Sequence, residues 1–239
     1  IVLRMVVGRG WGQGPTHSQN LQQLFAGIPG LKVIIPATPQ EGYSQLRASI
    51  RSNNPIIFLE HRWLHNMIGE VSEKFDKNDI KDLKVIRKGK DCTVLATSYM
   101  VPEAIKSAEV LNKFLKKDIE IISFSIYNLS SIKTVLESVK KTGLLIIADT
   151  AQESFSISHK LAIEIIKNVK NLKKIPEIIN MKDIPEPTSY FLTKGFYICA
   201  SDIVQSVGKL LEVDVSRILK SQEKTSHHDI PGEWFKGPF

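Results

Sequence analysis

The chain has few cysteines and no long hydrophobic run, and each shortage excludes a class of protein. Its 239 residues contain two cysteines, Cys92 and Cys199, which lie in apolar stretches and lack CxxC spacing. This usage fits reduced core thiols in a cytoplasmic protein better than a disulfide framework. The longest apolar runs, such as residues 144–148, fall far short of the roughly 20 residues that a membrane-spanning helix needs, so we predict no transmembrane segment.

Several nucleotide- and metal-binding signatures are also absent from the sequence. There is no GxxxxGK[ST] phosphate loop, and the glycines of GRGWGQG, residues 8–14, do not follow GxGxxG spacing. His61 and His65 stand four residues apart and could face one side of a helix as metal ligands, but the HExxH order and a third ligand are missing. His227 and His228 lie in the tail, where we expect surface side chains. We therefore predict no zinc site.

The net charge is positive but does not indicate a nucleic-acid surface. The formal charge is +7, from 32 Lys and Arg against 25 Asp and Glu. The lysines are scattered along helical faces and segment ends rather than gathered into an arginine-rich stripe with aromatic residues between them. Since a solvated lysine face commonly produces such a balance, we predict no nucleic-acid partner.

Short extended runs alternate with amphipathic helical patterns along the first part of the chain. We predict strands at residues 1–7, 31–35 and 55–60 and helices at 21–28 and 39–52. Short buried strands separated by amphipathic helices are typical of βαβ units around a parallel sheet. The chain begins at Ile1, inside the first run, and natural domains rarely begin in mid-strand. We therefore expect a fragment or a processed piece of a longer protein.

The same alternation returns after a polar segment. Residues 66–90 are charge-dense without strong periodicity, so we predict a linker there, and residues 214–239 read as an irregular tail. Between them we predict strands at 92–97, 119–125, 144–148 and 176–180, and helices at 101–116, 131–142, 155–169 and 201–211. Gly143 is expected to cap the second of these helices, and Ser201 to be the N-cap of the last. The predicted fold class is α/β, with one α/β domain within residues 1–65 and a second at 91–213.

The stretch GQGPTHSQ, residues 12–19, brings a histidine to the end of a glycine-rich loop. Thr16 followed three residues later by Gln19 fits a capping box, so we predict that a helix begins there with His17 in its first turn. Free backbone N–H groups and the helix dipole would favour an anion at such a place. The residues alone leave two interpretations open: a catalytic imidazole beside an anion-binding pocket, or a solvated side chain at a helix start.

Four segments resemble one known family. The runs QGPTHSQNLQQLFAGIPGLKVIIPATPQEG and LRASIRSNNPIIFLEHRWLH are similar to the beta subunit of thiamine-diphosphate-dependent 2-oxo-acid dehydrogenases, such as the pyruvate and branched-chain enzymes. The runs GKDCTVLATSYMVPEAIKSAEVL and SIKTVLESVKKTGLLIIAD resemble that family's transketolase-type C-terminal domain. The resemblance implies that residues 1–65 form the back part of a pyrimidine-binding domain and that 91–213 form a transketolase C-terminal domain.

The resemblance implies an enzyme whose thiamine diphosphate and Mg²⁺ lie between chains. In this family an alpha subunit carries the diphosphate and magnesium site, two alpha and two beta subunits form a heterotetramer, and a lipoyl acyltransferase accepts the acyl group made from the 2-oxo-acid substrate. The present sequence has no GDG motif, so a partner chain would supply the diphosphate and metal ligands. His17 matches the histidine of the family's HSQ motif, which lines the active-site channel and helps to orient the 2-oxo acid.

The resemblance also implies a structural potassium ion. Its ligands in the family correspond to Ile1, Ser49, Ile50, Ser52 and Asn54. Carbonyl and side-chain oxygens suit a hard cation, and a helix-to-strand loop such as ASIRSNNP can supply them. Ser52 stands where an aspartate is common in the family, which removes a negative ligand.

Three further departures from the family keep alternatives open. The family's catalytic glutamate lies upstream of the HSQ motif, and no position here can supply it. The turn ADTAQESFSISHKL has serines where the family has glycines, and the closing GEWFKGPF is typical of a divergent branch. The alternatives are a ketol transferase of the transketolase or deoxyxylulose-phosphate synthase type, and a subunit that assembles without catalysing.

Overall fold

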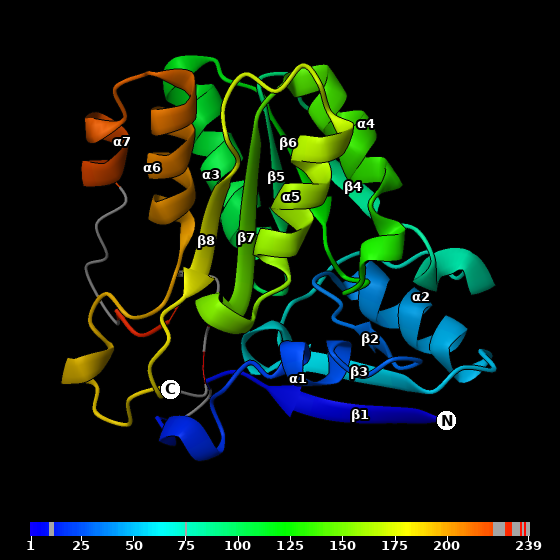
Figure 1. Ribbon diagram of the computed structural model, residues 1–239. Helices are drawn as coiled ribbons and strands as arrows, with labels where there is room; N and C mark the ends of the chain where they lie inside the picture. The colour runs from blue at the N-terminus through cyan, green and yellow to red at the C-terminus, as the bar shows by residue number, and fades with distance from the viewer. Residues whose placement is uncertain (10–11, 75, 222–227, 231–234, 236, 238–239) are drawn as a thin grey trace.

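Two β-sheets flanked by helices form the molecule (Figure 1). The computed structural model describes residues 1–9, 12–74, 76–221, 228–230, 235 and 237. The predicted α/β class is confirmed, because strands and helices alternate through both parts of the chain. Among the helices of these residues, none is both long and apolar enough to cross a membrane.

The first sheet has three parallel strands, in the order β1-β3-β2. Its strands are β1 (Val2–Val7), β2 (Lys32–Ile34) and β3 (Ile56–His61). The central strand β3 is buried from Ile56 to Leu59, as expected for a continuous apolar run with a neighbour on each side. Strand β1 lies at the edge of the sheet and exposes Leu3 and Val6. Because β1 and β3 are parallel, their carboxyl ends lie at the same edge of the sheet.

Two helices connect these strands. They are α1 (Gln22–Ala26) and α2 (Pro39–Ile50). The start of α2 is well specified, because the Thr38 side chain accepts a hydrogen bond from the Glu41 backbone N–H at 3.2 Å and Pro39 occupies the first turn. Glu41 is buried against the second part of the chain, and this burial raises the pKa of its carboxyl.

The second sheet has five strands, in the order β4-β6-β5-β7-β8. They are β4 (Lys84–Arg87), β5 (Cys92–Ala96), β6 (Ile119–Ser123), β7 (Leu145–Gln152) and β8 (Glu177–Met181). Strands β5 to β8 pair in parallel, whereas β4 is antiparallel to β6. The four strands predicted in this part of the sequence are therefore confirmed, and β4 is an addition.

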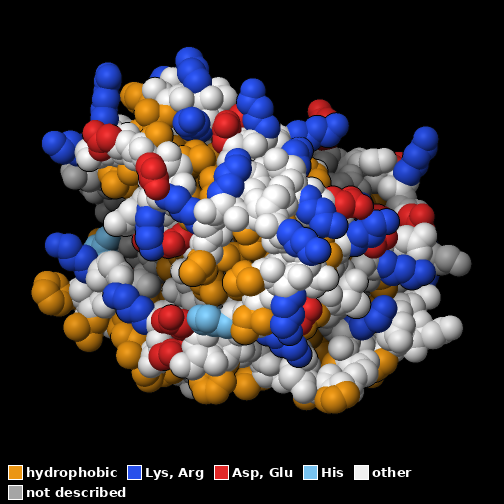
Figure 2. Space-filling view, turned by 45° about the horizontal axis from the view of Figure 1, so that its top comes forward, with side chains coloured by type: hydrophobic (Ala, Val, Ile, Leu, Met, Phe, Trp, Pro, Cys, Tyr) orange, Lys and Arg blue, Asp and Glu red, His pale blue; other side chains and the backbone are white. Residues whose placement is uncertain are grey.

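Helices cover both faces of the second sheet. They are α3 (Met100–Leu115), α4 (Lys133–Thr142), α5 (Ser158–Asn168), α6 (Ala200–Leu211) and α7 (Ser216–Ser221). Helices α3 and α6 pack on one face, and α4 and α5 on the other (Figure 1). Gly143 ends α4 with a φ of +76°, as predicted. Figure 2 shows Lys and Arg side chains spread over one side of the molecule among carboxylates and apolar groups.

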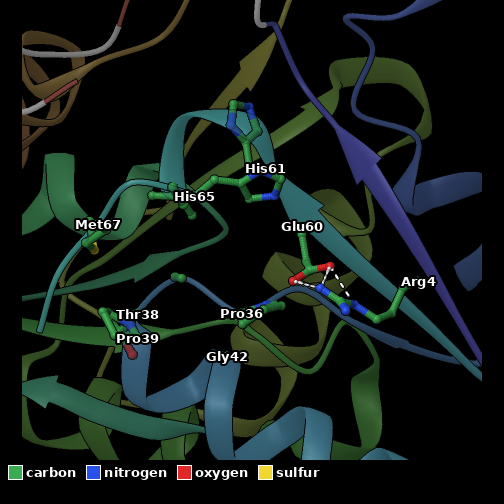
Figure 3. Close-up of a pocket in the computed structure, with 11 residues that line it drawn as sticks. Arg4, Pro36, Thr38, Pro39, Gly42, Glu60, His61, His65 and Met67 are labelled. Atoms are coloured by element: carbon green, nitrogen blue, oxygen red, sulfur yellow. Dashed lines mark hydrogen bonds and ion pairs between the residues drawn. The ribbon is translucent and has the colours of Figure 1, made fainter. Parts of the chain in front are cut away.

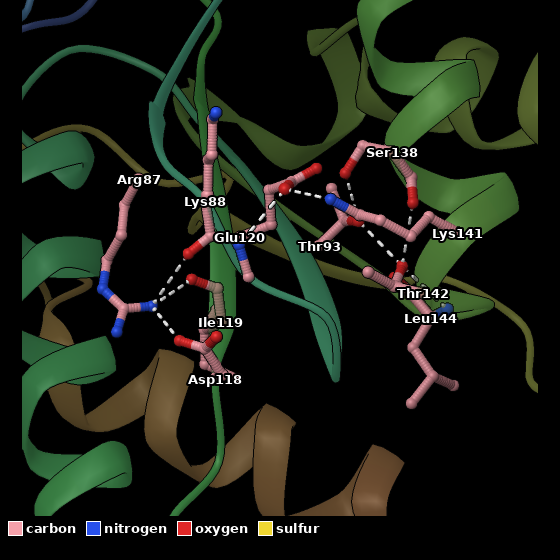
Figure 4. A network of polar contacts seen from close by, with 11 residues as sticks. Arg87, Lys88, Thr93, Asp118, Ile119, Glu120, Ser138, Lys141, Thr142 and Leu144 are labelled. Atoms are coloured by element: carbon pink, nitrogen blue, oxygen red, sulfur yellow. Dashed lines mark hydrogen bonds and ion pairs between the residues drawn. The ribbon is translucent and has the colours of Figure 1, made fainter.

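The predicted linker at residues 66–90 contains regular structure in its second half. Residues 77–80 form a short 3-10 helix, and β4 follows as the edge strand of the second sheet. Charged residues stabilise this edge (Figure 4): Arg87 binds Asp118 at 2.9 Å, and Lys141 of α4 contacts the buried carboxylate of Glu120. Behind them, the Thr93 hydroxyl bonds the Ser138 hydroxyl at 2.7 Å. Of the charges that suggested a solvated linker, Arg87 therefore pairs with the start of β6, and Lys84 pairs with Asp79 within the segment.

Two expectations near the C-terminus also need correction. Cys199, not Ser201, is the N-cap of α6, and its backbone N–H donates to Asp202 Oδ2 at 2.7 Å. Cys199 is half-buried and Cys92 is buried, and neither forms a disulfide bond within the described part of the chain. The tail is not wholly irregular, because α7 forms within it and Ile218 packs into the core.

Candidate active site

His17 follows a 3-10 helix, η1 (Gly14–Thr16), rather than opening an α-helix. The predicted capping box is wrong: Thr16 Oγ1 donates to Gln13 O at 3.3 Å, and Gln19 Nε2 donates to Pro15 O at 2.6 Å. Gly14, with a φ of +62°, and Pro15 start a tight turn that ends before α1 begins. The argument from a helix dipole therefore does not apply to His17, whose side chain is exposed.

Two glycines let the loop before His17 pack closely against both parts of the chain. Gly8 has a φ of +80°, and a Cβ there would overlap the ring of His61 at the end of β3. A Cβ on Gly14 would overlap the Thr188 side chain, which belongs to the second part. The glycine pattern in the sequence thus reflects close approach. Gly10 of the same pattern lies outside the described residues.

The residues after His17 enter the interface between the two sheets. Ser18, Asn20 and Gln22 are buried. Gln22 Nε2 donates to Asp149 Oδ1 at 3.2 Å and to Thr150 Oγ1 at 2.9 Å, both at the carboxyl end of β7. We call residues 17–22 the HSQ segment. Ligand sites of open α/β sheets lie outside the carboxyl ends of the strands, and this interface places the HSQ segment there.

Asp149 is a buried carboxylate whose hydrogen bonds all come from neutral groups. Its Oδ2 accepts from Tyr127 OH and from Ser156 Oγ, each at 2.6 Å, and its Oδ1 accepts from Ala151 N at 3.2 Å. Together with Gln22 these donors join both parts of the chain at one side chain. Sequence reasoning missed Asp149, although a lone acid at the end of the run GLLIIAD was a signal that could have identified it.

A second buried contact ties the glycine-rich loop to the C-terminal tail. Arg9 donates to Asp229 Oδ2 from Nε at 3.1 Å and from Nη2 at 2.5 Å, and it donates to Pro187 O at 3.3 Å. Its guanidinium lies 5.7 Å from the centre of the Tyr197 ring. Arg9 and Asp229 are 6% and 8% exposed, so the ion pair is largely shielded from water. His228, beside it, donates to or accepts from Thr193 Oγ1 at 3.2 Å, whereas His227 lies outside the described residues.

A pocket of about 390 Å³ lies beside β1, β3 and the start of α2 (Figure 3). Arg4 and Glu60 form a bidentate ion pair on its wall, with both donor–acceptor distances 2.9 Å. His65 also lines the pocket, but His17 does not. The pocket therefore lies at the carboxyl ends of β2 and β3, with no residue of the HSQ segment in its lining.

His61 is a packed neutral side chain. Burial and the nearby His65 and Arg62 charges lower its pKa to about 3. Its Nδ1 accepts a hydrogen bond from Trp63 N at 3.2 Å, and its ring centre lies 4.9 Å from those of Trp63 and Tyr99. His61 is therefore packed as a structural side chain. No cluster of three or more His, Cys, Asp or Glu suited to a metal occurs in the described ranges.

The residues expected at a potassium site lie at the opposite end of β1 from His17. Ile1 O accepts from Ile56 N at 3.0 Å, and Ser49 O accepts from Ser52 N at 3.0 Å. Ser52 Oγ accepts from the backbone and side-chain nitrogens of Asn54, at 3.2 and 3.1 Å. Ile50 lies between Ser49 and Ser52 in the sequence, and its side chain is exposed.

The oxygen set of this loop suits a cation only in part. The buried Ser49 Oγ has no hydrogen-bond partner among the described residues, as expected of an oxygen that could serve as a ligand. None of the five expected residues carries a carboxylate, so the set is neutral.

Each of the two parts of the chain matches a known family. Residues 1–66 match the family described as transketolase, pyrimidine binding domain, and residues 81–203 match the family described as transketolase, C-terminal domain. The chain therefore belongs to the transketolase family.

Within that family the chain is similar to named beta subunits. It is 32% identical over 213 residues to the acetoin:2,6-dichlorophenolindophenol oxidoreductase subunit beta of Cupriavidus necator, covering 89% of this chain and 63% of that protein. It is 32% identical over 214 residues to the pyruvate dehydrogenase E1 component subunit beta of Mesostigma viride, covering 88% and 64%. The chain thus spans less than two thirds of the length of these relatives. The resemblance to beta subunits is confirmed.

A solved structure shows the same fold. A split gene transketolase, described as an inactive beta4 tetramer, superposes with a TM-score of 0.67 at 17% sequence identity. The match covers 89% of this chain and 66% of that one.

Proposed function

We propose that the protein is a beta-type subunit of a thiamine-diphosphate-dependent 2-oxo-acid dehydrogenase. The observation that carries this proposal is the HSQ segment, which a glycine-rich loop holds at the interface of the two sheets with His17 exposed. The beta subunits named among its relatives support the same class. We also propose the domain division predicted from the sequence: a pyrimidine-binding segment at 1–65, a connection at 66–90 whose strand β4 joins the second sheet, a C-terminal domain at 91–213 and a tail at 214–239.

The residues of this chain do not by themselves fit thiamine diphosphate and Mg²⁺. The sequence has no GDG motif, and the described residues hold no cluster of acidic or imidazole groups suited to a metal. We therefore propose that an alpha subunit supplies the diphosphate and magnesium ligands, in an assembly with a second beta subunit. A lipoyl acyltransferase as acceptor and a cytoplasmic location complete the proposal.

His17 is the catalytic residue of this proposal. Its exposed imidazole can donate a hydrogen bond or a proton to the carboxylate of a 2-oxo acid or to an oxyanion that develops on it. When bound, thiamine diphosphate supplies the carbon nucleophile and the electron sink, so the protein has to supply only orientation and proton transfer.

The division of labour predicts that the chain alone does not bind the cofactor. Titrating thiamine diphosphate and Mg²⁺ into the isolated chain should give no binding heat in a calorimeter, because the diphosphate ligands are missing. The same titration into the chain assembled with its alpha partner should give a saturable signal. Micromolar affinity of the isolated chain would contradict the proposal.

We propose a weak potassium site in the loop between α2 and β3. The proposal predicts that one substitution strengthens potassium binding. Ser52→Asp adds the missing carboxylate, so replacing sodium by potassium at constant ionic strength should raise the melting temperature of this variant more than that of the wild type. Asn53→Asp adds the same charge one residue away and is the matched control. Equal responses of the two variants would show that the loop does not bind the ion through Ser52.

A further inference from the structure

A small cavity separates the HSQ segment from the second part of the chain. It offers about 10 Å³ to the centre of a water-sized sphere, which is room for about one water molecule. Its walls are formed by two groups of residues. The HSQ segment contributes Gln19 and Asn20, and the second part contributes Thr150, Gln152, Met181, Lys182, Glu186 and Phe196.

Glu186 is the acidic side chain on this wall, and it is 5% exposed. Its Oε2 accepts a hydrogen bond from Tyr197 OH at 3.0 Å. The nearest strong cation, Arg9, is already paired with Asp229 at 2.5 Å. Lys182 donates to Gly195 O at 2.9 Å, so its charge is directed to a carbonyl. In the described part of the chain, Glu186 forms no ion pair of its own.

Burial is the strongest influence on the charge of this carboxyl. It raises the pKa of Glu186 to about 8, against the opposing hydrogen bond from Tyr197 and the charge of Arg9. At neutral pH the carboxyl is therefore mostly protonated and has an O–H to donate.

Asn20 also lines this cavity and carries an acceptor without a partner in the described part of the chain. Asn20 is 6% exposed, and its Oδ1 has no hydrogen-bond partner among the described residues. A buried acceptor without a partner is costly, and a water molecule that bridges two polar groups removes most of that cost. The cavity between Asn20 and Glu186 has the size for one such water.

We propose that Glu186 is a positioning residue which donates a hydrogen bond, through one water molecule in this cavity, to Asn20 and thereby fixes the HSQ segment against the second sheet. Its effect on turnover rests on the proposed function, because it acts through the segment that carries His17. Its effect on stability does not.

The sign of the pH dependence follows from the two states of Glu186. In the unfolded chain the carboxyl ionises near its ordinary pKa of 4.5, whereas in the folded chain it keeps its proton up to about 8. Between these values the folded state binds more protons, so raising the pH favours unfolding. Stability from Glu186 is fully present below about pH 4.5 and is lost as the pH rises through about 8.

The first test compares the wild type with Glu186→Gln, which keeps a donor and cannot ionise. From pH 6 to pH 8 the unfolding equilibrium constant of the wild type should rise roughly 50-fold more than that of the variant. Both proteins keep the charged and titratable groups that the described residues place around this carboxyl, which are Tyr197, Tyr99, Arg9, Asp229 and Lys182. Parallel pH profiles would overturn the proposal.

The second test asks whether Glu186 acts on Asn20. A double-mutant cycle with Glu186→Leu and Asn20→Ala should show coupling of about 5-fold in the unfolding constant, as expected for one bridged hydrogen bond. Additive effects would overturn the proposal. If the leucine variant does not fold, Glu186→Ala, which also removes the donor, replaces it in the same cycle with the same expected coupling, and additive effects would again overturn the proposal.

The third test uses the enzyme assembled with its alpha partner. Above pH 8 the wild type should lose turnover while Glu186→Gln keeps it, with little change of KM in either. The assembled wild type could have no turnover while its unfolding constant still changes with pH as in the first test. That result would contradict the proposed function and leave the role of Glu186 intact. Equal loss of turnover in both proteins would overturn the positioning role.

Discussion

Replacing His17 by alanine is expected to lower the turnover of the assembled enzyme about 100-fold or more, as for the loss of a positioned acid–base group. The side chain is exposed, so stability should change little. Turnover and melting temperature, measured on the same preparation, separate a chemical role from a structural one.

His159→Ala is the matched control for this experiment. His159 is an exposed histidine on α5, so its removal should leave turnover unchanged. If the alanine variant at His17 keeps a near-normal rate, His17 is a solvated loop residue and the proposed function loses its catalytic group. A rise in KM with kcat preserved would assign His17 to substrate binding rather than to chemistry.

Asp149→Ala is expected to cause the largest loss of stability among single side-chain changes near the interface. It removes the acceptor that Tyr127, Ser156 and Gln22 share. The buried Tyr127 hydroxyl then loses its acceptor, whereas Gln22 keeps its bond to Thr150 Oγ1. We expect the free energy of unfolding to fall by about 3–5 kcal/mol. For a chain of this size that corresponds to a melting temperature lower by roughly 6–20 °C.

The control for Asp149 is Asp82→Ala, which removes an exposed carboxylate from the same chain. Surface changes of this kind usually alter stability by less than about 0.5 kcal/mol. A small effect of Asp149→Ala would mean that water replaces the lost acceptor and that the carboxylate does not join the two parts of the molecule. Asp149→Asn should fall between the two, since it keeps one oxygen.

The elements that local sequence determines could be predicted. The strands β3, β5, β6 and β7 contain short apolar runs that include β-branched residues, so their positions could be predicted from local sequence. Gly143 was recognised as a helix end because only a residue tolerant of a positive φ ends α4 without strain.

Patterns with two physical meanings misled the prediction. Thr16 and Gln19 have the spacing of a capping box, but Gly14 and Pro15 fix a tight turn first, so both side chains bond the turn instead. Strand β4 was missed because its charged residues, such as Arg87, suggest solvent, whereas an edge strand can carry charges that pair with the next strand.

Contacts between distant residues could not be predicted at all. Gln22 and Asp149 are 127 positions apart, and Arg9 and Asp229 are 220 apart. Nothing in the sequence near one member of either pair specifies the other. These two pairs, rather than the HSQ motif itself, hold the candidate site in place.

The outer edge of β1 has a practical consequence for handling the chain. In the described residues β1 pairs only with β3, and it exposes Leu3 and Val6 beside a row of backbone donors and acceptors. Open apolar edges of this kind recruit strands from other molecules, so self-association competes with correct refolding as concentration rises. Light scattering during dilution from denaturant therefore measures how far the outer edge of β1 is protected from pairing with other molecules.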